Sequence, residues 1–213
     1  RDYSAMEVVI LAWLCEMLFG DRSLYSAVEL GGKFHTVNSY NVFGTKLGWS
    51  HPSGRPISSW SLSEYEKLVK TDDYFSCRRK DAKTVWYGAQ YRKSGRGFGY
   101  TLLNSDGEPI GEVAGQEVLD AFLEEAPALN RWYRFTDDWL SDYLYMPGPS
   151  GRLRDLHDLL GTHRATGKQD WQFRSAARKG GNHPMQEMCA AIKMAAIWEI
   201  INNRDFQHLG GIL

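Results

Sequence analysis

Two segments of the sequence combine clustered cations with aromatic side chains, a combination that suits contact with a nucleic-acid strand. Residues 78–96 hold seven basic residues and a single acidic one, and residues 152–179 hold seven basic and three acidic residues. Cations neutralise phosphates, whereas flat aromatic faces stack on bases. We therefore predict nucleic-acid contact through Arg78, Arg79, Lys80, Lys83, Trp86, Tyr91, Arg92, Lys93, Arg96, Arg152, Arg154, Arg164, Lys168, Trp171, Arg174, Arg178 and Lys179.

The charges of the chain are sorted into blocks. The net charge is −1, which excludes a uniformly basic nucleic-acid coat, yet residues 106–142 carry ten acidic residues against Arg131 and Arg134. Such sorting allows a local positive face on a nearly neutral protein. We expect both basic segments to share one basic patch that contacts mainly the backbone of DNA or RNA. Two alternatives remain open, because the acidic block could neutralise the cations and the aromatic residues could belong to the core.

No sequence motif assigns a catalytic set. The chain has no phosphate-binding loop, no dinucleotide-binding glycine pattern and no nucleophile elbow. Its six histidines and three cysteines lack the close spacing of zinc ligands. We therefore predict no metal and no cofactor, and whether the chain is an enzyme stays open.

One short stretch points to a different chemistry. Glu29-Leu30-Gly31-Gly32 and the segment Tyr-Asn-Val-Phe-Gly-Thr-Lys at residues 40–46 resemble the catalytic-glutamate and Asn-Leu-Phe-Gly-Ile-Lys segments of autolysin-type glucosaminidases. The resemblance covers about residues 29–48 and departs from that family's Glu-Ser-Gly-Trp-Gly pattern. It implies an alternative function, a peptidoglycan-cleaving hydrolase with Glu29 as general acid.

A third function class is a protein–protein interaction module. The chain has eight tryptophans, and aromatic side chains are enriched in protein interfaces. A protein partner is therefore an alternative to a nucleic-acid partner.

Hydrophobic periodicity predicts an α+β fold, mostly helical, with a small three-stranded antiparallel meander. Two apolar runs, near residues 4–19 and 183–203, predict helices that are buried in one core. Between residues 84 and 113, alternating side chains and two turn sequences predict the meander. Pro147-Gly148-Pro149 is the best linker candidate, so we expect parts 1–146 and 147–213 to pack as one compact unit.

The apolar run at residues 5–19 is too short to span a bilayer, and two glutamates interrupt it, so we expect no membrane contact. Three well-separated cysteines favour a reducing compartment over a disulfide framework. We expect a cytoplasmic or nucleoid-associated protein, or a secreted one if a signal peptide precedes Arg1.

Overall fold

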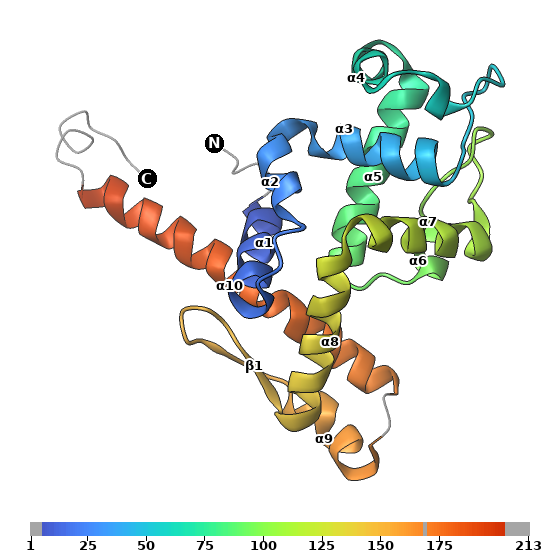
Figure 1. The fold of residues 1–213 in the computed structure, drawn as a ribbon. Coiled ribbons are helices and arrows are strands. Elements are labelled where there is room, and N and C mark those ends of the chain that lie inside the picture. Colours follow the sequence, from blue (N-terminus) through green and yellow to red (C-terminus); the bar gives the residue numbers. More distant parts are fainter. Residues whose placement is uncertain (1–5, 168–169, 203–213) are drawn as a thin grey trace. The chain divides into compact units, whose positions relative to one another are not determined.

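The computed structural model describes residues 6–167 and 170–202 and is mostly helical (Figure 1). Short helical turns cover Gly31–Lys33 and Ile57–Ser59, and a π-helical segment covers Tyr40–Lys46. The longer elements, in chain order, are α1 (Met6–Phe19), α2 (Tyr25–Leu30), α3 (Phe34–Ser39), α4 (Leu62–Thr71), α5 (Asp73–Gln90), α6 (Gly95–Gly99), α7 (Gly111–Glu125), α8 (Pro127–Asp142), β1 (Tyr145–Pro147), β2 (Leu153–Asp155), α9 (His157–Thr166) and α10 (Trp171–Asn202).

The described residues form two compact units. Residues 15–132 make up the first, and residues 6–14 join residues 133–202 in the second. In the first unit, α3 and α4 both pack against α5, and α6 packs against α7. The second unit is built around a buried apolar cluster contributed by α8, β1, α9 and α10, with Leu140, Met146, Leu160 and Phe173 among its members.

Side-chain caps define where α4 and α5 begin. The Ser61 hydroxyl accepts a hydrogen bond from the Glu64 backbone amide, and the Glu64 carboxylate accepts one from the Ser61 amide. This reciprocal pair is the capping box expected from Ser-Leu-Ser-Glu at residues 61–64. The Asp72 carboxylate accepts hydrogen bonds from the amides of Tyr74 and Phe75 and so fixes the first turn of α5.

The predicted three-stranded meander is wrong. Residues 84–90 continue α5, and the described residues contain one two-stranded sheet, in which β1 pairs antiparallel with β2. The side chains that α5 buries include Phe75, Ala82, Val85 and Ala89, which follow a helical period from Asp72 onward. Alternation within residues 85–91 covers too short a window to outweigh that longer pattern.

α6 and α7 approach each other backbone to backbone. A Cβ added to Gly99 would lie 2.3 Å from the carbonyl oxygen of Gly111, and one added to Gly115 would lie 2.3 Å from that of Gly95. Only glycine fits at either position without displacing the neighbouring helix.

The hairpin of β1 and β2 contains the Pro-Gly-Pro segment that was predicted as a linker. Pro147 pairs with Leu153, and the Gly148 amide donates to the carbonyl of Arg152. Gly151 adopts a φ of +87° in the connecting turn, a conformation that favours glycine. The segment therefore lies inside the second unit.

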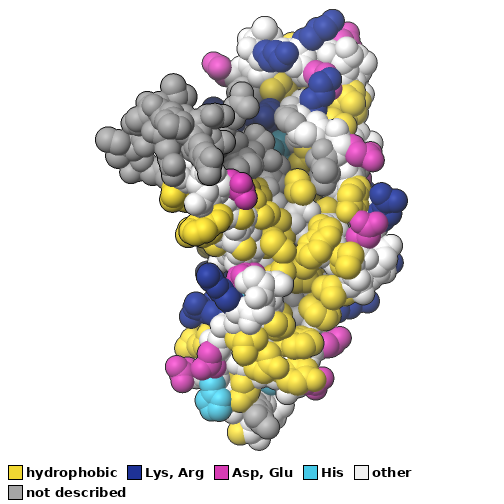
Figure 2. Space-filling model, turned by 90° about the vertical axis from the view of Figure 1, so that its left-hand side faces the viewer, with side chains coloured by type: hydrophobic (Ala, Val, Ile, Leu, Met, Phe, Trp, Pro, Cys, Tyr) yellow, Lys and Arg dark blue, Asp and Glu magenta, His cyan; other side chains and the backbone are white. Residues whose placement is uncertain are grey.

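α10 departs from the sequence expectation in its start and its burial. It begins at Trp171 rather than near residue 183, and Pro184 lies inside it. The prediction of a core helix is wrong for its second half, where Met194, Trp198 and Ile201 are exposed. Exposed hydrophobic side chains are abundant on the face drawn in Figure 2. No described helix is both long and apolar enough to cross a membrane.

Candidate nucleic-acid interface

One face of α5 presents a row of cations. Arg79, Lys83 and Tyr87 follow one another at intervals of four residues, which places them on the same side of the helix. Lys80 lies on the adjoining edge. The side chains of Lys80 and Lys83 are exposed, whereas those of Arg79 and Tyr87 are half-buried where α3 packs on α5. The three cations Arg79, Lys80 and Lys83 are together called the α5 cationic face.

Contacts with α3 and along α5 hold two of these cations in place. Arg79 donates a hydrogen bond from Nε to Thr36 Oγ1, with 3.2 Å between the two atoms. The Lys83 ammonium lies 5.9 Å from the centre of the Tyr87 ring, within the range of a cation–π contact. Because Arg79 uses Nε for this bond, its two terminal nitrogens remain available to an anion.

No acidic side chain of the described residues lies within ion-pair distance of Arg79, Lys80 or Lys83. Other cations of the first unit are neutralised. In the acidic segment, residues 106–142, carboxylate oxygens of Glu124 and Glu125 lie 2.8 Å and 3.4 Å from the Lys46 ammonium. A carboxylate oxygen of Glu112 lies 4.0 Å from Nε of Arg96. The acidic segment thus neutralises other cations and leaves the α5 cationic face without a carboxylate partner.

The positive charge of the α5 cationic face contributes to the pKa of His35. The residue is half-buried, and its ring lies 6.0 Å from the Tyr87 ring, measured between centroids. Burial, together with the nearby charges of Arg79 and Lys83, lowers the pKa of His35 to about 4. The imidazole is therefore neutral at pH 7, and the two cations are the positive charges at this position.

Two predicted contact residues lie in the interior instead. The Trp86 side chain is 1% exposed and makes edge-to-face contacts with Phe34 and Phe122, so it is a core residue. The Arg78 side chain is 3% exposed; its guanidinium donates to the Leu103 carbonyl at 2.9 Å and pairs with Asp81 at 3.1 Å. Neither side chain reaches the surface of α5, because both lie on the helix face that packs inward.

The remaining residues of the first basic segment follow the end of α5. Tyr91 is half-buried at its C-terminal cap, and Arg92 has a φ of +55°, which reverses the chain direction. Lys93 donates to the hydroxyl of Thr101 and lies over the Phe98 ring. Arg96 is exposed. The side chains of this turn therefore make more contacts within the protein than those of the α5 cationic face do.

The second basic segment lies in the other compact unit. Trp171, Arg174 and Arg178 follow helical spacing on α10 and are exposed, with 71% of Trp171 accessible. Arg152, Arg154 and Lys179 are exposed as well, while Lys168 and the side chain of Arg164 lie outside the described part. The prediction that both segments share one patch stays a prediction.

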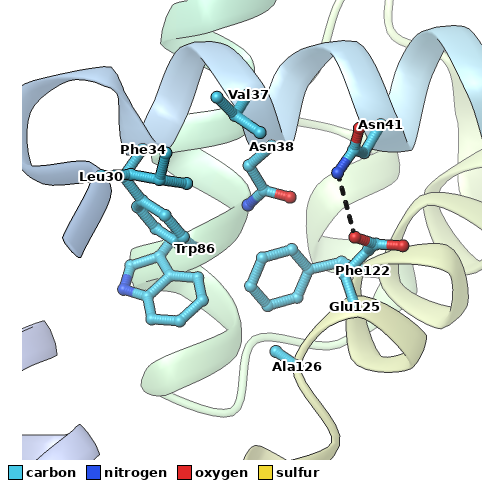
Figure 3. A pocket seen from close by; sticks show the side chains of 9 residues that line it. All are labelled: Leu30, Phe34, Val37, Asn38, Asn41, Trp86, Phe122, Glu125 and Ala126. Atoms are coloured by element: carbon cyan, nitrogen blue, oxygen red, sulfur yellow. Dashed lines mark hydrogen bonds between the residues drawn. The ribbon is translucent and has the colours of Figure 1, made fainter. Parts of the chain in front are cut away.

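A pocket of about 280 Å³ opens between α3, α5 and the end of α7 (Figure 3). Aromatic side chains of Phe34, Trp86 and Phe122 line it together with the polar side chains of Asn38, Asn41 and Glu125, and Leu30, Val37 and Ala126 complete the lining. No sequence pattern marks these residues as a set, because several elements that are far apart in the sequence contribute them. Only the tertiary packing brings the side chains together.

The general acid of the glucosaminidase alternative lies outside this pocket. Glu29 is exposed in the last turn of α2 and is absent from the pocket lining. A glycosidase acid usually owes its proton to a buried setting, which Glu29 lacks. Among the described residues, no three His, Cys, Asp or Glu side chains cluster as metal ligands.

Comparisons with known proteins reveal distant similarity to polymerases. No protein-family profile matches the sequence. The chain is 25% identical to DNA polymerase I A, chloroplastic/mitochondrial, of Arabidopsis thaliana over 98% of its own length and 18% of the relative's. It is 24% identical to the Arabidopsis DNA polymerase I B and 23% identical to the chloroplastic DNA polymerase I A of Oryza sativa subsp. japonica, covering 98% of this chain and 19% of each relative. The chain thus spans about a fifth of the length of the curated relatives it matches.

Proposed function

We propose that this chain is a DNA-handling part of a polymerase-like protein and that the α5 cationic face contacts phosphate groups of the DNA backbone. The observation that carries the proposal is the row of Arg79, Lys80 and Lys83 without a carboxylate partner among the described residues. Cations that the protein itself does not neutralise remain free to pair with phosphates.

The distant similarity supports the choice of ligand. The relatives are named as DNA polymerases, and the similarity covers nearly the whole chain. The exposed Trp171, Arg174 and Arg178 on α10 supply a second set of side chains suited to backbone contact and base stacking. In this proposal DNA is bound mainly through its backbone.

The test is a binding titration with fluorescently labelled single-stranded and double-stranded DNA, followed by anisotropy at about 50 mM salt. A variant with Arg79→Ala, Lys80→Ala and Lys83→Ala should bind at least tenfold more weakly than the wild type, because it loses several phosphate contacts. RNA strands of matching sequence form a third arm. Tighter binding of RNA than of DNA would contradict the choice of DNA.

A charge-matched control separates specific contacts from net charge. A variant with Lys67→Ala, Lys70→Ala and Lys193→Ala removes the same number of charges from exposed positions outside the predicted segments. It should bind within about twofold of the wild type. Equal losses in both triple variants would show that only net charge matters and would refute the proposed face.

A further inference from the structure

We infer that the pocket between α3, α5 and α7 binds a nucleobase, with Asn38 reading the hydrogen-bonding edge of the ring. The inference rests on the proposed function for the identity of its ligand, and it concerns a site beside the α5 cationic face rather than the cations themselves.

The first observation concerns the position of the Asn38 side chain. Its side chain is 6% exposed, and among the described residues its amide has no hydrogen-bond partner. Figure 3 shows this side chain pointing from α3 into the pocket, between Trp86 and Phe122. The amide atoms of Asn38 are not among the described side-chain atoms that are fully buried without a hydrogen-bond partner, so they remain accessible from the pocket.

The second observation is that aromatic side chains line a pocket of limited volume. Phe34 and Phe122 both meet Trp86 edge to face, with ring centroids 4.7 Å and 5.2 Å apart. Aromatic and apolar walls with a few polar groups are typical of small-molecule sites. A volume of about 280 Å³ suits one planar ring system rather than a drug-sized ligand.

The polar groups match the edge of a base. The Asn38 amide offers one acceptor oxygen and a donor nitrogen side by side, and every nucleobase presents an adjacent donor and acceptor. At the rim, Asn41 donates to the Glu125 carboxylate at 3.2 Å. Lys46 pairs with the other carboxylate oxygen at 3.4 Å, and the lone pairs that these two contacts leave can accept from an exocyclic amino group. An apolar ring would satisfy none of these groups.

The pocket adjoins the cationic face along α5. Trp86 follows Lys83 by three residues, so the buried Trp86 side chain and the exposed Lys83 side chain lie on adjoining sides of α5. Phe34 and His35 are consecutive on α3, with His35 turned toward Tyr87 and the two cations. A base in the pocket would therefore bring its sugar and phosphate toward Lys83.

The test uses the four deoxynucleosides, which carry no phosphate, and follows binding by calorimetry and by the Asn38 side-chain amide signal in NMR spectra. At least one deoxynucleoside should bind and shift that signal. Asn38→Leu should weaken its binding at least fivefold, because the variant keeps the shape but loses both hydrogen-bonding atoms. The variant should melt close to the wild type, because leucine has nearly the shape of asparagine, and this measurement checks that the variant is folded.

Asn130→Leu is the matched control, since Asn130 is exposed on α8 and away from the pocket lining. It should bind nucleosides like the wild type. Absence of nucleoside binding, equal binding by Asn38→Leu, or equal binding of toluene would each overturn the inference. Salt-dependent DNA binding without nucleoside binding would overturn the pocket alone, whereas Asn38-dependent nucleoside binding without DNA binding would overturn only the proposed function.

Discussion

The guanidinium of Arg79 on α5 is tied to the hydroxyl of Thr36 on α3 by a 3.2 Å hydrogen bond from Nε to Oγ1. Thr36 is itself buried where the two helices pack. The bond fixes an arginine whose charge meets no carboxylate among the described residues. A cation that is held in one orientation loses less conformational freedom when it binds an anion.

Replacing the hydroxyl tests this positioning role. Thr36→Val keeps the volume and every charge of the α5 cationic face but removes the acceptor. DNA binding should weaken about twofold to fivefold, while the dependence of affinity on salt stays unchanged because no cation is lost. Fluorescence anisotropy at several salt concentrations measures both quantities. An affinity equal to that of the wild type would show that the bond does not position Arg79 for binding.

The titration of His35 should report phosphate binding nearby. Arg79 and Lys83 contribute to the lowered pKa of about 4, after burial as the larger cause. Phosphates that neutralise these two cations should raise the pKa of His35 toward its ordinary value. NMR titration of the His35 ring with and without bound DNA measures the change. A pKa that stays the same or falls on DNA binding would contradict phosphate contact at this face.

His35 should also make the fold less stable in acid. The unfolded histidine titrates near pH 6.5 and the folded one near pH 4, so the unfolded state binds more protons between these values and stability falls as the pH drops. Asp81 acts in the opposite sense, because burial raises its pKa to about 6. Relative to His35→Gln, the wild type should lose about 2 kcal/mol of unfolding free energy between pH 7 and pH 4.5. Urea titrations at both values measure it, and parallel losses in the two proteins would refute the assignment.

Two glycine substitutions should have opposite effects on stability. Gly115→Ala places a Cβ 2.3 Å from the Gly95 carbonyl oxygen, so it should destabilise the first unit by more than about 2 kcal/mol. Gly161→Ala, inside α9, meets no atom within 4 Å and should stabilise the second unit by roughly 0.5–1 kcal/mol. Thermal unfolding of each variant provides the comparison. A harmless Gly115→Ala would contradict the close packing of α6 and α7.

The sequence is informative for helices and helix caps that have a strong local residue pattern. The apolar run near residues 4–19 is helical in α1 from Met6, the first residue described, and Ser61 with Glu64 caps α4 as expected. The meander was mispredicted because Val85, Tyr87, Ala89 and Tyr91 alternate like one face of a strand, although they lie in or directly after a helix that Asp72 starts much earlier. The last helix was predicted near residues 183–203, but α10 begins at Trp171, and Pro184 lies in its interior.

The candidate site was predictable in its charge and not in its geometry. The cations of α5 belong to a cluster that is visible in the sequence, yet Arg78 lies on the buried side of the helix and Lys83 on its exposed side. Burial of Trp86 depends on Phe34 and Phe122, which come from two other helices. No sequence pattern marks Asn38, since its importance arises from a pocket that several elements form together.

The most direct measurement of phosphate contact at the α5 cationic face is the slope of log Kd against log salt concentration for double-stranded DNA. Each lost phosphate contact reduces the magnitude of that slope by about 0.9. The variant lacking Arg79, Lys80 and Lys83 should therefore show a slope smaller by about 2 to 3 than the wild type, and the Lys67, Lys70 and Lys193 control should keep the wild-type slope. An unchanged slope in the α5 variant would contradict the account.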